Sequence, residues 1–208
     1  LRGAATGNVQ LTSPMNSKGL LADILCDSTY IADEPLGTVT LKSIWNDEFE
    51  RFEISVRNEL EDKANIHATA KLTPKSRMLD ARISLDSLSI TYAEPFMKDV
   101  FSEMKGTISG DILAEGPVDR LDIRSSGTRL EDAILKVDYT NVPYFAGGDF
   151  HIDDSGVYFD DINIRDRYNG TGKVTGSIGW DRFNDIMCDT RISVSSIEGL
   201  DLDESMNE

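Results

Sequence analysis

The sequence predicts an all-β protein built from one antiparallel sheet, with a single short helix. Apolar and polar residues alternate with a period of two over most of the chain, which is typical of strands with one apolar and one polar face. Only one segment has helical spacing, and glycines interrupt several strands. Parallel strands are usually covered on both faces, so one-sided strands in close succession favour antiparallel pairing.

The strands of the first half follow this alternation closely. Residues 51–58 and 65–72 each place apolar side chains at every second position. Residues 81–92 begin in the same way, but the apolar phase shifts by one residue near Asp86 and Ser87. A shift of one residue would turn the following side chains to the other face, so a bulge or a tight bend is expected there.

The second half continues the series with shorter strands. Alternation recurs over residues 135–139, 150–164 and 174–194. The stretch "DDSG", residues 153–156, lies between two alternating apolar runs. Asp and Gly in such a place predict a β-hairpin.

One segment, residues 94–104, has the spacing of an amphipathic helix. Phe96, Val100 and Met104 recur at every fourth position, and Pro95 suits a first helical turn. We expect this helix to lie over the apolar face of the sheet, just before the glycine-rich strands begin.

Glycines spaced four apart occur twice, at Gly106 and Gly110 and again at Gly172 and Gly176. A glycine inside a strand lets the sheet bend or lets another backbone come close. Two interpretations follow. The glycines mark turns and bulges of an ordinary sandwich, or they coil the sheet into a trough with an exposed apolar inner face.

Charge narrows the choice of partners. Acidic residues number 37 against 21 basic ones, for a net charge of −16. Nucleic acids and anionic bilayer surfaces are bound by clustered Lys and Arg, so this balance argues against both. No stretch approaches the ~20 apolar residues of a membrane-spanning helix, and no signal peptide is visible. The start without Met predicts a piece of a longer protein.

Residue types with catalytic or metal-binding chemistry are sparse. His67 and His151 have no partner at a metal-binding spacing, and no nucleophile or phosphate-loop motif occurs. Cys26 and Cys188 are predicted to be buried free thiols, with a disulfide as the alternative. The acidic run at 153–166 offers oxygen ligands for calcium but lacks the loop spacing, so solvated turn residues are expected. We therefore predict a protein that is not an enzyme and has neither cofactor nor metal.

Several segments recur in an order that is typical of one protein family. They are the helix "PFMKDVFSEM", the strands "GTISGDILAEGPVDRLDI", the segment "KVDYTNVPYF", the run "DFHIDDSGVYFDDINIRDRYNGTGKVTGSIGWDRFND" with Asp166, Gly170, Gly172 and Gly176, and the strand "RISVSSIEGLDL". In this order the chain resembles the C-terminal conserved region of the TamB family (translocation and assembly module), within the AsmA-like superfamily. Its residues look closest to members from Bacteroidetes-like bacteria.

The resemblance implies a β-taco fold, in which an elongated, curved antiparallel sheet forms an open apolar groove. Such proteins belong to the Gram-negative cell envelope. They are anchored in the inner membrane, cross the periplasm and meet an outer-membrane β-barrel of the TamA/BamA type. The anchor is expected outside this chain. Residues 1–77 would form the N-terminal part of the groove, 78–203 the conserved region, and 204–208 an acidic tail.

The implied function is carriage of phospholipid between the two membranes, with acyl chains on the apolar face. Each candidate lining residue has ordinary core packing as its alternative. The candidates are Phe52, Ile54, Ile83, Leu85, Ile108, Ile112, Val137, Phe150, Ile152, Val174, Ile178, Ile186 and Ile192. A scaffold that pairs an edge strand with incoming outer-membrane proteins is a second hypothesis. A glycan-binding sandwich is the third, and the aromatic content of 8% argues against it.

Overall fold

The structure is a computed structural model, and it describes most of the chain. The backbone is described for residues 2–12, 19–31, 34–61, 63–98, 100–181 and 184–199. Within these ranges side chains are described from Ala22 onward, apart from Phe96, residues 180–186 and Cys188. The predicted acidic tail, residues 204–208, lies outside the described residues.

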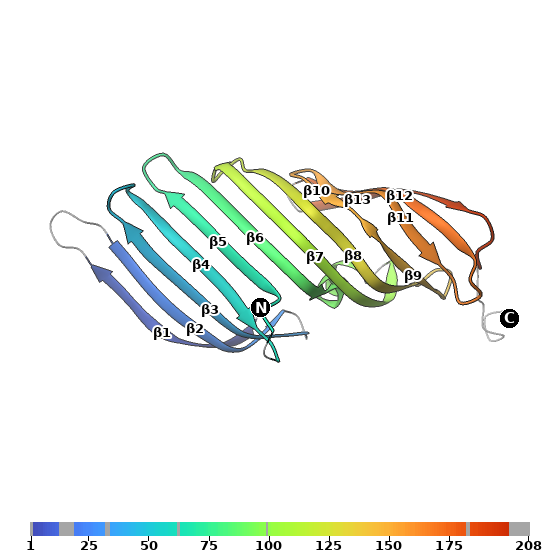
Figure 1. The fold of residues 1–208 in the computed structure, drawn as a ribbon, viewed down its shortest axis with the longest axis horizontal. Coiled ribbons are helices and arrows are strands. Elements are labelled where there is room, and N and C mark those ends of the chain that lie inside the picture. Colours follow the sequence, from blue (N-terminus) through green and yellow to red (C-terminus); the bar gives the residue numbers. More distant parts are fainter. Residues whose placement is uncertain are drawn as a thin grey trace. The chain divides into compact units, whose positions relative to one another are not determined.

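Most described residues are in strands, as Figure 1 shows. The elements are β1 (Arg2–Thr12), β2 (Gly19–Ile31), β3 (Glu34–Asn46), β4 (Arg51–Glu59), β5 (Ile66–Thr73), β6 (Met78–Ser89), the 3-10 turn η1 (Ile90–Ala93), α1 (Glu94–Met97), β7 (Phe101–Pro117), β8 (Asp122–Val137), β9 (Val142–Asp149), β10 (His151–Ile152), β11 (Gly156–Arg165), β12 (Thr171–Asp181) and β13 (Asn184–Val194).

The strands form one sheet in chain order, from β1 to β9 and then β11 to β13, with β10 paired to β11 alone. The registers that are resolved are all antiparallel. The predicted all-β antiparallel fold is confirmed. Short connections between sequential strands explain the order, because antiparallel neighbours need only a hairpin turn.

The chain divides into two compact units. Unit 1 comprises Leu1–Asp86 and Gly110–Ser126, and unit 2 comprises Ser87–Ser109 and Gly127–Glu208. The strands β6, β7 and β8 each contribute residues to both units. The division after residue 77, which concerns the extent of the conserved region, stays a prediction.

In unit 1 the strand register sorts side chains onto two faces, because directly opposed residues of an antiparallel pair point the same way. One row across β2–β6 is Ile24, Leu41, Val56, Ala68 and Ile83. Parallel rows on the same side contain Ile54, Ala70 and Ala81, then Trp45, Phe52, Leu72 and Leu79, and then Val39, Ile66 and Leu85. We refer to these rows as the apolar face of unit 1, and to the alternate residues as its polar face.

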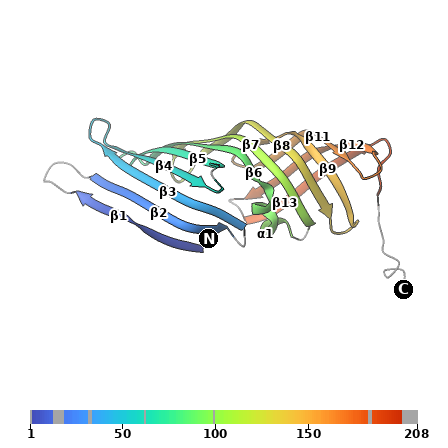
Figure 2. The same cartoon turned by 60° about the horizontal axis from the view of Figure 1, so that its bottom comes forward.

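Among the described residues, unit 2, unlike unit 1, contains a small cluster of buried hydrophobic residues. Its buried residues are Ile90, Met104, Ala133, Ala146 and Ile162. Ala93 and Met97 pack against them, so the η1–α1 turn covers part of the apolar side of β7–β11. Figure 2 shows α1 out of the plane of the neighbouring strands.

The helix predicted over residues 94–104 is wrong in length. Its α-helical part ends at Met97, and β7 begins at Phe101. Met104, placed on the helix face by its spacing, is a buried strand residue, and the Glu94 carboxylate accepts a hydrogen bond from its backbone N–H at 3.2 Å. An isolated helix of about eleven residues is marginal, whereas pairing with β8 gives this segment a full strand partner.

Two other local predictions are confirmed. Ser87, where the apolar phase changes, has a φ of 51°. The "DDSG" turn closes the hairpin between β10 and β11, with the N–H of Asp153 donating to the carbonyl of Gly156 at 3.0 Å.

The strand glycines are sites of close backbone approach. Gly106 has a φ of 119°, and a Cβ there would lie 2.6 Å from the Cα of Ala133. Gly176 has a φ of 145° and faces the register shift of β11 after Phe159. Gly110 also has positive φ, whereas Gly172 does not. That these glycines bend the sheet stays a prediction.

Candidate binding surfaces

The apolar face of unit 1 is the first candidate surface. Its central row, Ile24, Leu41, Val56, Ala68 and Ile83, is apolar on all five strands, which at a spacing of about 4.8 Å makes the row about 19 Å wide. The side chains of its central row are half-buried. Among the residues described for unit 1, all secondary structure is strand of this one sheet, and Ala22 and Leu36 are the only buried hydrophobic residues. Within the unit, side chains shield one another along the rows, and no described element covers them.

Four of the predicted lining residues lie on this face. Phe52, Ile54, Ile83 and Leu85 are all half-buried there. Ile112, on β7, is half-buried as well. Its neighbour Asp111 accepts a hydrogen bond from Ser84, on the polar face, at 2.6 Å. Because successive side chains of a strand alternate, Ile112 points to the apolar side.

The predicted lining residues of unit 2 have more varied surroundings. Ile108 and Val174 pack against the buried core of that unit. Ile192 is 59% exposed. The side chain of Ile186 lies outside the described residues. The remaining four are half-buried, namely Val137, Phe150, Ile152 and Ile178.

A buried Asn that the sequence did not single out interrupts the apolar face of unit 1. Asn58 is 2% exposed, and its amide donates to the carbonyl of Leu36 at 3.1 Å. Its oxygen accepts from the backbone N–H groups of Asn65 and Ile66, at 3.0 and 2.7 Å. Asn58 therefore ties β4 to the start of both neighbouring strands. The sequence does contain a signal for this residue, because Asn58 occupies the position after Phe52, Ile54 and Val56 where the alternation calls for an apolar side chain.

Asp166 has a comparable role in unit 2. Its carboxylate accepts hydrogen bonds from the N–H groups of Tyr168, Gly170 and Glu198 at 2.7–2.8 Å. These donors, that of Glu198 foremost, hold the pKa of Asp166 below its ordinary value of 3.8, although burial opposes them. Through these hydrogen bonds Asp166 connects the segment after β13, at Glu198, to the β11–β12 turn, at Gly170.

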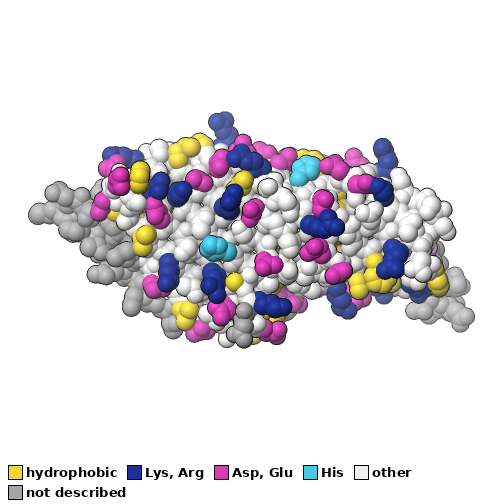
Figure 3. Space-filling model, in the orientation of Figure 1, with side chains coloured by type: hydrophobic (Ala, Val, Ile, Leu, Met, Phe, Trp, Pro, Cys, Tyr) yellow, Lys and Arg dark blue, Asp and Glu magenta, His cyan; other side chains and the backbone are white. Residues whose placement is uncertain are grey.

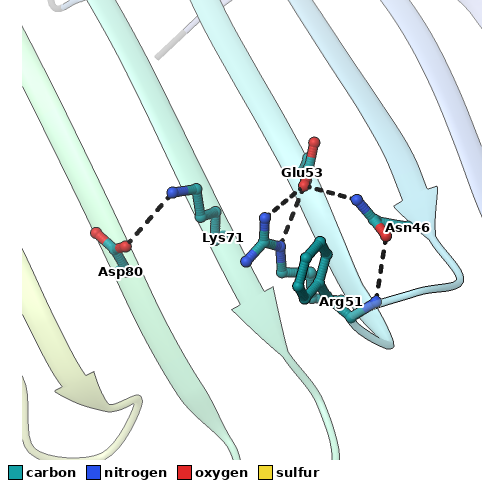
Figure 4. A network of polar contacts seen from close by, with 6 residues as sticks. Asn46, Arg51, Glu53, Lys71 and Asp80 are labelled. Carbon is teal, nitrogen blue, oxygen red and sulfur yellow. Dashed lines mark hydrogen bonds and ion pairs between the residues drawn. The ribbon is translucent and has the colours of Figure 1, made fainter.

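The polar face of unit 1 carries ion pairs, drawn in Figure 4. The Glu53 carboxylate accepts hydrogen bonds from Arg51 at 2.8 Å and Asn46 at 3.0 Å, and these lower the pKa of Glu53, with the Arg51 bond the largest cause. Lys71 and Asp80 lie 3.8 Å apart on β5 and β6. Figure 3 shows basic and acidic side chains interspersed over the side of the molecule in view.

The described residues contain few features of other site classes. They include no group of three His, Cys, Asp or Glu side chains placed to hold a metal ion. Cys26 is a half-buried free thiol, and the side chain of Cys188 lies outside the description. Among the residues that the structure describes, no helix is both long and apolar enough to cross a membrane.

The chain was compared with protein families, curated proteins and solved structures. No protein-family model, no curated protein and no solved structure matches the chain.

Proposed function

We propose that this chain is a non-enzymatic, lipid-binding segment of a TamB-like envelope protein, and that phospholipid acyl chains lie on the apolar face of unit 1. The observation that supports the proposal most directly is the half-buried apolar row across β2–β6, which no described element of that unit covers. A broad apolar surface that stays partly accessible to water on an acidic protein supports binding of a ligand or a partner.

Binding on such a face needs no catalytic group. Each CH₂ removed from water contributes about 0.8 kcal/mol, and rows of similar side chains give nearly equal binding along the surface. In the proposal the chain carries phospholipid through the periplasm, between an inner-membrane anchor and an outer-membrane β-barrel of the TamA/BamA type. The order of the glycine-spaced segments and the "DYTNVPY" segment supports that assignment.

The test uses two substitutions of the same kind on opposite faces of one hairpin. Ile54→Asp places a carboxylate on the apolar face, whereas Ile44→Asp places it on the polar face, where Ile44 is already 50% exposed. We expect Ile54→Asp to lower bound phospholipid about tenfold or more, since it removes a large apolar contact. Native mass spectrometry of the purified chain measures lipid occupancy.

The Ile44→Asp variant is the control and should keep its lipid within about twofold. Circular dichroism checks that both variants remain folded. Equal lipid occupancy in the folded Ile54→Asp variant, or absence of lipid from the parent chain, contradicts the proposal.

A second candidate function is edge-strand pairing with incoming outer-membrane proteins. The strand β13 stands at one end of the strand order, and Met187, Ile192 and Val194 on it are 70%, 59% and 49% exposed. Exposed apolar edge strands are ready templates for pairing with another chain. Binding of an unfolded outer-membrane barrel segment by chain that carries no lipid would favour this candidate.

A further inference from the structure

We propose that the polar face of unit 1 carries a separate binding site for a phosphate group, formed by the row Lys42, Ser55, Thr69 and Arg82. The site lies on the face opposite the proposed lipid surface and does not depend on that function.

The register brings these four residues together from four strands. Lys42 on β3 is opposite Ser55 on β4, Ser55 is opposite Thr69 on β5, and Thr69 is opposite Arg82 on β6. All four line one surface hollow of about 640 Å³. With about 4.8 Å between strands, the two cations stand about 14 Å apart at the Cα atoms, and the two hydroxyls lie between them.

None of the four side chains is engaged elsewhere. Among the described residues, neither hydroxyl makes a hydrogen bond, and neither Lys42 nor Arg82 forms an ion pair. Asp23 is opposite Lys42 in register, yet the two form no ion pair and Asp23 does not line the hollow. The donors are therefore available to a ligand.

The carboxylates that line the hollow are already matched. Glu53 pairs with Arg51 at 2.8 Å, Glu115 with Arg124 at 2.7 Å, and Asp80 faces Lys71 at 3.8 Å. Figure 4 shows the first and last of these pairs beside one another. The positive charges of Lys42 and Arg82 remain uncompensated, in a chain whose net charge is −16.

The chemistry of the donors fits a phosphate group. A phosphate offers several acceptor oxygens, which two hydroxyls and two cations approaching from opposite sides satisfy together. An Arg can donate to it in a bidentate fashion, and a Lys acts as a point charge. Because the whole chain repels anions at long range, these local contacts must supply the affinity.

The experiment is a titration of the ¹⁵N-labelled chain with inorganic phosphate at constant ionic strength. We expect saturable amide shifts centred on Ser55 and Thr69. The double variant Lys42→Gln/Arg82→Gln should bind phosphate about tenfold more weakly or worse, because two charge-assisted contacts are lost.

The matched control is Lys63→Gln/Lys98→Gln, which removes the same charge from exposed positions outside the hollow. It should bind phosphate as the parent does. An equal loss in both double variants, or shifts that never saturate, would show a bulk charge effect and overturn the proposal.

A second arm separates the two possible sources of the phosphate. Phosphatidylcholine vesicles with and without phosphatidic acid are titrated with the same variants. Binding of inorganic phosphate alone, dependent on Lys42 and Arg82, assigns a free phosphate. Binding of the phosphatidic acid vesicles with that dependence assigns a lipid head group. If neither arm depends on Lys42 and Arg82, no phosphate site exists there.

Discussion

In each unit, one buried polar side chain connects segments of that unit by hydrogen bonds. Asn58 and Asp166 are each nearly inaccessible to water. Each forms hydrogen bonds with backbone groups of a segment distant in the sequence. Buried backbone groups without a partner are costly, so such side chains act as fixed ties between strands.

For Asn58 we expect a large effect of truncation. Asn58→Ala leaves two backbone N–H groups and the carbonyl of Leu36 without a partner, which should lower the free energy of unfolding by about 2 kcal/mol or more. Urea denaturation measures this. The exposed Asn163→Ala should change the free energy by no more than about 0.5 kcal/mol. Equal stability of the two variants would remove the role assigned to Asn58.

For Asp166 we expect a dependence on pH. Its pKa is lowered in the folded chain, so the ionised group stabilises the fold above its ordinary pKa of 3.8, and this contribution is lost as the pH falls through the lowered value. The stability difference between the parent and Asp166→Asn should therefore be largest near neutral pH and shrink in acid. Denaturation from about pH 2 to about pH 7 measures it.

The control for Asp166 is Asp154→Asn, at an exposed position of the neighbouring hairpin turn. A constant difference between parent and Asp166→Asn across this pH range would show that the charge of Asp166 is irrelevant to the fold.

Among the elements, β7 and β12 depend on glycines that no other residue replaces easily. Gly106→Ala combines a positive φ with a Cβ 2.6 Å from a backbone atom of Ala133. We expect it to cost about 2 kcal/mol or more in unfolding free energy.

Two further alanine variants separate the causes. Gly127 has a φ of 62° but open space around its Cβ position, so Gly127→Ala should cost only about 1 kcal/mol. Gly199, with open space and no positive φ, should be almost neutral. If all three variants were equally stable, close approach at Gly106 would be irrelevant.

The spacing of apolar residues predicted the type of element correctly where the pattern was long. The prediction was wrong where the pattern was short. The alternation at residues 51–58 and 65–72 predicted β4 and β5 and the face of Phe52 and Ile54. The spacing of residues 94–104 also fits a helix, yet most of that helix is absent. Local spacing is ambiguous over so few residues, and pairing with β8 decided the outcome.

At the scale of the whole chain, one sheet presents different chemistry on its two faces in unit 1. The apolar rows and the row from Lys42 to Arg82 are displaced by a single residue on every strand. A slip of one residue would exchange the faces, so the register that creates one proposed site also creates the other.

The amino-acid sequence by itself determined the strands, their antiparallel pairing and the separation of apolar from charged faces, because these follow from a period of two and from short turns. Only the tertiary structure decided three contacts. Asn58 donates a hydrogen bond to the carbonyl of Leu36, Asp166 accepts one from the N–H of Glu198, and Lys42 and Arg82 line the same hollow. The members of these sets are 22, 32 and 40 residues apart, and a local period of two does not record the register and the packing that bring these particular groups together.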